Sequence, residues 1–339
     1  KRDGNKGGEG GPRKTLPRPQ YEGDPEALID LLWDTNQAAG EEPPDINDVK
    51  SLIENGINVK WCDPFGFIAL HYASDYGYTN IVKALINAEP DDTHIWMQDT
   101  SVEGTTALYR ASKNGHLNVV KELIKVMHDR KDIWIKDNRG YTALHVASGN
   151  GHLDVVNELI KVMRDRKDIW IKDGYGYTAL HVASENGHLD VVNKLIAYGS
   201  GAHIRMRDNA GNTALHMAAL DSYIGVSEAL INADPTFEHF NIQNTRGDTA
   251  LHLALLDAVN GINFYEFIYD ICKTNREKMM ELFNIKNDYE DTIISSLVKY
   301  DDEGEEKIKE LNIGGFMDVM NKMRNLFDWG PDAGPSYIP

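Results

Sequence analysis

A six-residue segment recurs through this chain at an almost constant interval. Its form, Gly-x-Thr-Ala-Leu-His, is complete at Gly140–His145, and successive copies begin at glycines 38, 36, 36, 35 and 36 residues apart. The six glycines are Gly66, Gly104, Gly140, Gly176, Gly211 and Gly247. A fixed period of this length indicates stacked supersecondary units, none of which can bury its apolar face without a neighbour. The sequence therefore predicts a solenoid, and it favours binding over catalysis.

Each residue of this segment has a structural reason. Glycine permits the positive φ of a tight turn, and the threonine, as in Thr142, suits a helix N-cap. The leucine and the alanines predict the buried stripe of a short first helix. A second motif, Asn-Gly-His-Leu, begins at Asn114, Asn150 and Asn186 and predicts a turn into a second helix. The remaining segment, such as Ile133-Trp134-Ile135, alternates and predicts a projecting hairpin finger.

The two motifs together resemble the ankyrin-repeat family over roughly residues 24–300. The family usually has proline after the threonine, where this chain has alanine, which retains helical propensity. The resemblance implies an all-α solenoid of stacked helix pairs with short β-hairpin fingers and atypical capping repeats at both ends. It implies a binding function without naming a ligand, because the family has no common ligand.

The expected organisation has five parts. They are a basic Gly/Pro-rich flexible arm at residues 1–20, an N-terminal capping repeat at 21–62, a solenoid of about six repeats at 63–282, a degenerate C-terminal capping repeat with helices at 283–327, and an extended tail at 328–339. The arm and the tail cannot bury enough surface to fold alone, so we expect them to order only on a partner.

The charge is uneven along the chain. The whole sequence carries a formal charge of −18, whereas residues 1–19 hold six Lys/Arg against Asp3 and Glu9. An acidic solenoid repels nucleic acid and anionic membranes, and no apolar stretch approaches a membrane span. We therefore expect protein partners with a basic surface, within a hetero-oligomer, and neither nucleic acid nor membrane insertion. The alternative is that the acidity only keeps an elongated surface in solution.

The two cysteines, Cys62 and Cys272, show no metal or redox spacing. This usage indicates a reducing, intracellular compartment, with the cytoplasm first and an organelle lumen or a host cytosol as alternatives.

An internal duplication singles out candidate binding residues. Residues 121–156 and 157–192 align without gaps, and 31 of 36 positions are identical. The changes include those at the expected finger tip and at the end of the first helix, where family members usually bind. The candidate protein-binding residues are Asn138, Arg139, Tyr141, Gly149, Tyr175, Tyr177 and Glu185. The alternative is neutral drift at exposed positions.

Tryptophan recurs between two apolar residues in three successive repeats, at Trp96, Trp134 and Trp170. Strand alternation would send these side chains to the face opposite the isoleucines, as an exposed ladder and a candidate protein-binding surface. In the alternative, each indole folds back on the long connection that precedes it, which would explain why these repeats exceed the usual length.

The histidines do not indicate catalysis. Most recur once per repeat, too far apart to share a metal ion, and such residues hold backbone turns through their ring nitrogens. No phosphate-binding loop, nucleophile elbow or zinc spacing is present, so we expect no catalytic, cofactor or metal site. The predicted function is a non-catalytic protein-interaction scaffold, in one version a fixed subunit of a large assembly. The alternatives are a free adaptor or secreted effector of an intracellular microbe, or the binding region of an enzyme whose catalytic domain lies outside this chain.

Overall fold

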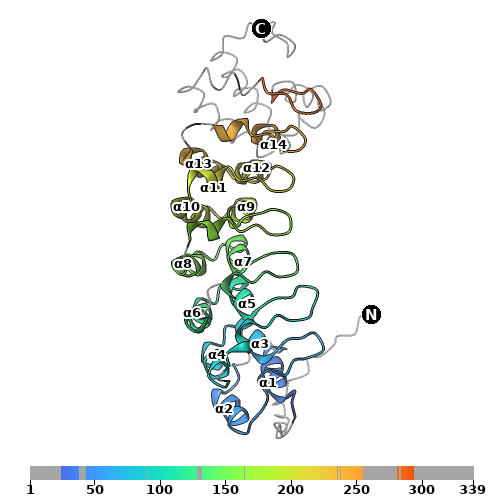
Figure 1. The fold of residues 1–339 in the computed structure, drawn as a ribbon, viewed down its shortest axis with the longest axis vertical. Helices are drawn as coiled ribbons and strands as arrows, with labels where there is room; N and C mark the ends of the chain where they lie inside the picture. The colour runs from blue at the N-terminus through green and yellow to red at the C-terminus, as the bar shows by residue number, and fades with distance from the viewer. Residues whose placement is uncertain are drawn as a thin grey trace, which may run out of the picture.

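The computed structural model describes residues 24–37, 43–89, 91–127, 132–163, 165–234, 236, 238–254, 281 and 284–293. Within them the helices stand in two columns, and loops project from one column to the same side (Figure 1). The inner column, which carries these loops, contains α1 (Ala27–Gln37), α3 (Ala69–Asp75), α5 (Ala107–Lys113), α7 (Ala143–Gly149), α9 (Ala179–Glu185), α12 (Ala214–Leu220) and α14 (Ala250–Ala254). The outer column contains α2 (Ile46–Glu54), α4 (Thr79–Ile86), α6 (Leu117–Val126), α8 (Leu153–Lys161), α10 (Leu189–Tyr198) and α13 (Ile224–Ala233).

The sequence motifs explain both columns. Thr142 has the extended backbone of an N-cap just before α7, and Gly151 adopts φ +73° in the turn to α8. The outer helix α8 then buries one apolar stripe, formed by Val155, Val156, Leu159 and Ile160. From α1 to α12, each inner helix packs on the next inner helix and on its own outer helix. One apolar core runs from Leu28 to Ile293, which confirms the all-α solenoid.

The connections from outer helices to fingers differ from the expectation. They contain η1 (Thr93–Trp96), η2 (Asp132–Trp134), η3 (Arg166–Trp170), α11 (Gly201–Ile204) and η4 (Glu238–Asn241). The prediction that Ile133-Trp134-Ile135 forms a finger strand is therefore wrong. A bond from the Ile135 N–H to the Asp132 carbonyl oxygen closes a 3₁₀ turn there, and a short apolar run fits a turn with one buried residue as well as a strand.

The fingers themselves begin after these turns and are loops in the described residues. Their only β pairing there is isolated, as in the bridges Cys62 to Ile68 and Lys286 to Thr292. The second bridge belongs to the degenerate C-terminal repeat, in which Glu290 takes the place of the turn glycine with φ +63°. The arm at 1–20, the tail at 328–339 and the helices expected in 294–327 lie outside the described residues, and the domain limits remain predictions.

Candidate functional site

An aspartate or asparagine at the base of each finger shapes its turn. Asp137 Oδ1 accepts the backbone N–H groups of Arg139 at 2.9 Å and Tyr141 at 2.7 Å. Gly140 has φ +88°, and a Cβ there would lie 2.5 Å from the backbone nitrogen of Gly174 in the next finger. The same carboxylate or amide turn recurs at Asp63, Asp173, Asn244 and Asn287. Hydrogen bonds within each finger therefore fix the shape of its turn.

Neighbouring fingers are also joined to one another. The Gly174 N–H donates to the Arg139 carbonyl oxygen at 2.8 Å, and equivalent backbone bonds link the described fingers along the stack. A second series runs beside it, in which a side chain two or three residues after each short helical turn donates to the equivalent carbonyl of the next repeat. Its donors are Gln98, Lys136, Lys172, Arg207 and Gln243. The fingers therefore form one continuous edge.

A histidine in the first turn of most inner helices connects two repeats. The Thr142 N–H donates to His145 Nδ1 at 3.2 Å, and His145 Nε2 lies 3.0 Å from the Tyr177 carbonyl oxygen. Nε2 must carry the hydrogen of that bond, so Nδ1 is the acceptor. Burial lowers the pKa of His145 to about 4. The same bonds form at His181, His216 and His252. This confirms the structural role predicted for these residues.

Three of the candidate residues come together on the surface between the fingers and the inner helices. Tyr177 and Glu185 lie at the two ends of this surface in one repeat, and Tyr141 lies on the preceding finger. Burial raises the pKa of Tyr177 to about 12, and the next contribution comes from the Glu185 carboxylate. Burial and then Asp173 and Glu185 raise the pKa of Tyr141 to about 12. The Glu185 carboxylate therefore acts electrostatically on both tyrosines.

The finger-tip candidates lie at the projecting edge. Asn138 and Arg139 are exposed in one finger, and Tyr175 is 60% exposed in the next. The Asn138 side chain donates to the Val102 carbonyl oxygen of the preceding finger at 3.2 Å, so part of its polar surface is already used. The Tyr175 ring lies beside the Tyr177 ring, with 6.4 Å between the two centroids.

Gly149 has a packing reason for its small size. A Cβ at this position would lie 2.7 Å from Val182 Cγ1, and the Gly149 carbonyl oxygen accepts from His188 Nε2 at 2.9 Å. The equivalent residue one repeat later is Glu185, whose larger side chain therefore changes the surface where the inner helix ends. The two repeats therefore differ in surface shape as well as in charge at the end of the inner helix.

The tryptophans do not form an exposed ladder. Three half-buried side chains pack against the apolar core, those of Trp96, Trp134 and Trp170. Each follows a buried isoleucine, which is Ile95, Ile133 or Ile169. The tryptophans end 3₁₀ turns instead of lying in strands, so the alternation of side chains along a strand does not apply to them and does not direct them outward. Their placement agrees with the alternative, in which each indole folds against its own repeat.

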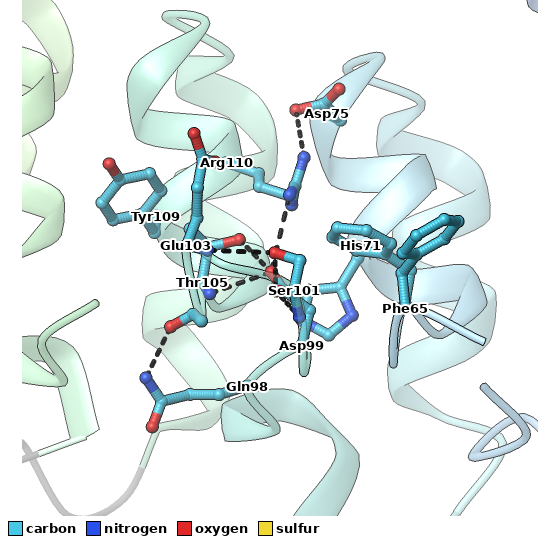
Figure 2. A network of polar contacts seen from close by, with 12 residues as sticks. Phe65, His71, Asp75, Gln98, Asp99, Ser101, Glu103, Thr105, Tyr109 and Arg110 are labelled. Atoms are coloured by element: carbon cyan, nitrogen blue, oxygen red, sulfur yellow. Dashed lines mark hydrogen bonds and ion pairs between the residues drawn. The ribbon is translucent and has the colours of Figure 1, made fainter. Parts of the chain in front are cut away.

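A polar network at the N-terminal end of the same surface was missed by the sequence analysis. Figure 2 shows the Arg110 guanidinium between two carboxylates, with Nη1 3.4 Å from Asp75 Oδ1 and Nη2 3.5 Å from Asp99 Oδ2. The guanidinium also lies over the Phe67 ring, 4.3 Å from its centroid. Burial opposes ionisation of Asp99, but hydrogen bonds from Ser101 and Thr105 leave its pKa below the ordinary value.

The signal for this network existed in the sequence. An aspartate or asparagine precedes most turn glycines by three residues, and in the longer finger of this network Asp99 precedes Gly104 by five. Arg110 replaces an apolar residue of the inner-helix stripe. The repeat alignment alone does not show that Arg110 reaches back to the preceding repeat, because that contact depends on how the repeats stack.

Neither a metal centre nor a membrane span is found in the described part of the chain. No three His, Cys, Asp or Glu side chains gather there in an arrangement that would hold a metal ion. None of the helices described has both the length and the apolar character that a membrane crossing needs.

Comparison with known sequences agrees with the geometry. A family model described as ankyrin repeats in three copies matches residues 36–137 and 122–208. These stretches together span just over half of the sequence, and the chain belongs to the ankyrin-repeat family. Ankyrin repeats are protein–protein interaction modules and are typically non-catalytic. No curated protein matches this chain in sequence.

Proposed function

We propose that this chain is a non-catalytic scaffold that holds a protein partner against its fingers and inner helices. The observation that carries the proposal is the surface formed by Tyr141, Tyr177 and Glu185 beside the exposed Tyr175. Tyrosine provides a large, rigid contact area with a polar end, and it is enriched at the centres of protein interfaces.

The charge of this surface supports a basic partner. Asp173 and Asp208 lie at the finger bases, and Asp221 follows inner helix α12; all three act on Glu185. Burial and then these carboxylates raise the pKa of Glu185 above its ordinary value. A partner that brings positive charge here relieves that repulsion, and complementary charge also speeds association. The partner and this chain would then form a hetero-oligomer.

A site-specific crosslinking experiment tests the proposal. A photoreactive amino acid replaces Tyr175 on the finger edge or, as the matched control, Lys161 on outer helix α8. Both side chains are exposed, so they sample solution equally well. In cells or extract of the source, we expect a discrete crosslinked protein from position 175 and none from position 161. The same adduct from both positions, or from 161 alone, contradicts the proposal.

The purified partner then allows a quantitative test. Tyr177→Ser should weaken its binding at least tenfold, because a central tyrosine commonly contributes more than about 1.4 kcal/mol to binding. Lys161→Ser should leave the affinity unchanged. The native mass of the chain in its source extract separates a fixed subunit of an assembly from a free adaptor.

A further inference from the structure

The Arg110 network shows how this scaffold accommodates a guanidinium group. The cation rests on an aromatic ring from the preceding finger, Phe67. It pairs with a carboxylate at the end of the preceding inner helix, Asp75, and with one at the base of its own finger, Asp99. Three positions, two in one repeat and one in the next, thus define a seat for one arginine. Figure 2 shows the chain's own Arg110 paired with the two carboxylates of this seat.

The same three positions carry the same chemistry further along the solenoid. In repeat register, Tyr177 corresponds to Phe67, Glu185 to Asp75, and Asp208 to Asp99. The position of Arg110 is occupied by Met217, which is buried and carries no charge.

The stacking of the repeats brings the three groups of this second seat to one junction, because α9 packs on α12 as α3 packs on α5. Glu185 and Asp208 both act electrostatically on the Tyr177 hydroxyl, and Asp208 acts on Glu185, which agrees with this placement. The seat has its ring and both anions, and lacks the cation.

Two carboxylates in this region lack a cationic partner. The Glu185 side chain makes no hydrogen bond or ion pair with any described residue. Beside it, Asp173 is only 8% exposed, and its Oδ2 has no hydrogen-bond partner in the described structure. The Tyr141 hydroxyl acts on the Asp173 carboxylate, but it makes no hydrogen bond to Oδ2. A buried anionic oxygen without a donor is costly, and it points to a donor that arrives from outside.

The other described junctions do not repeat the combination. Between α5 and α7 the helix-end position is Lys113, which repels a cation, and the ring position is Thr105. Between α7 and α9 the helix-end position is Gly149, and between α12 and α14 it is Leu220. The empty seat at Tyr177, Glu185 and Asp208 is therefore specific to one place among these junctions.

We propose that Tyr177, Glu185 and Asp208 form a vacant arginine seat that receives an arginine side chain of the protein partner. The inference rests on the proposed function and names the chemistry that this surface recognises. Arginine suits it better than lysine, because a planar guanidinium can stack on the ring and still donate to two carboxylates. Asp173 Oδ2 lies nearby to accept a further donor from the same partner segment.

An arginine introduced into the chain beside the seat tests the geometry of the seat without a partner. In Met217→Arg the chain supplies its own guanidinium, whereas in the matched control Val146→Arg the new side chain faces Lys113. Both changes place arginine at the same repeat position in a buried site. We expect the first variant to melt about 3–5 °C above the second, and Glu185→Gln in the Met217→Arg background to remove that difference. Equal melting temperatures for the two arginine variants would overturn the proposal.

Short peptides test recognition directly, even if an arginine variant fails to fold. The probe is an acetylated and amidated Gly-Arg-Gly peptide, compared with its citrulline and lysine counterparts. The NMR resonances of the Tyr177 ring and the Glu185 carboxyl should shift saturably with the arginine peptide, less with lysine and negligibly with citrulline. Equal shifts with citrulline, or shifts spread evenly over exposed carboxylates elsewhere, would overturn the proposal.

These results are distinguishable from failure of the proposed function. If a partner crosslinks at position 175 while the arginine peptide leaves Tyr177 and Glu185 unmoved, the scaffold function stands and the arginine seat is wrong. If the peptide binds at the seat while the partner crosslinks only at the outer helix α8, the seat stands and the proposed binding face is wrong.

Discussion

Acid should weaken this solenoid through its buried histidines. Burial lowers the pKa of five of them to about 4: His71, His145, His181, His203 and His216. Their ordinary pKa is 6.5, so between pH 6.5 and 4 the unfolded chain binds more protons than the folded chain. Stability is therefore complete above pH 6.5 and falls as the pH decreases toward 4.

The size of the effect follows from the two pKa values. Between pH 7.5 and 5.5 each histidine lowers the free energy of unfolding by about 1 kcal/mol, and the five together lower it by roughly 5–7 kcal/mol. Since domains are commonly stable by about 5–15 kcal/mol, this loss is enough to bring the chain near unfolding.

Urea unfolding followed by circular dichroism at pH 7.5, 6.5 and 5.5 measures the loss. His145→Gln cannot take up the proton, so its free energy of unfolding should change by about 1 kcal/mol less over this range. The matched control Leu144→Ala should cost about 2–5 kcal/mol at every pH through its cavity, with an unchanged pH dependence. A wild-type pH dependence in His145→Gln would refute the reasoning.

Two further changes test the fingers. Gly140→Ala forces a side chain onto a φ of +88° and against the next finger, so it should cost about 2 kcal/mol or more, measured by urea unfolding. Gly201→Ala in α11 has no atom within 4 Å of the new Cβ, and should be neutral or slightly stabilising. Asp137→Ala removes a buried carboxylate that accepts two backbone N–H groups of the finger turn, at about 2–3 kcal/mol. Asp190→Ala on the exposed face of α10 should cost at most about 1 kcal/mol; equal losses in the two aspartate variants would contradict the role given to the turn.

The sequence predicts those features that depend on one repeat and its period. Thr142 as a cap, Gly140 in a turn and the apolar stripe of α8 all follow from residue type and spacing, and the structure confirms them. The tryptophan segments were misread because three apolar residues in a row do not distinguish a strand from a 3₁₀ turn.

Contacts between repeats were harder to predict. Arg110 reaches Asp75 in the preceding repeat, and the Glu185 carboxylate acts electrostatically on Tyr141 and Asp208 in the two neighbouring repeats. These contacts depend on the rotation and distance between stacked layers, which no single-repeat pattern contains. The candidates Tyr141, Tyr177 and Glu185 came from comparing duplicated segments, and their binding role stays a prediction.

The bonds that join successive fingers have an evolutionary consequence. Lys136, for example, donates to the backbone carbonyl of Lys172, and the Gly174 N–H donates to that of Arg139. Because each acceptor is a backbone carbonyl, whatever residue stands in the next repeat supplies it. A copied repeat can therefore be inserted by recombination and be joined to its neighbours before any side chain has adapted. The near-identical segments 121–156 and 157–192 are what such a copying event would leave, with the finger tip and the helix end then free to diverge.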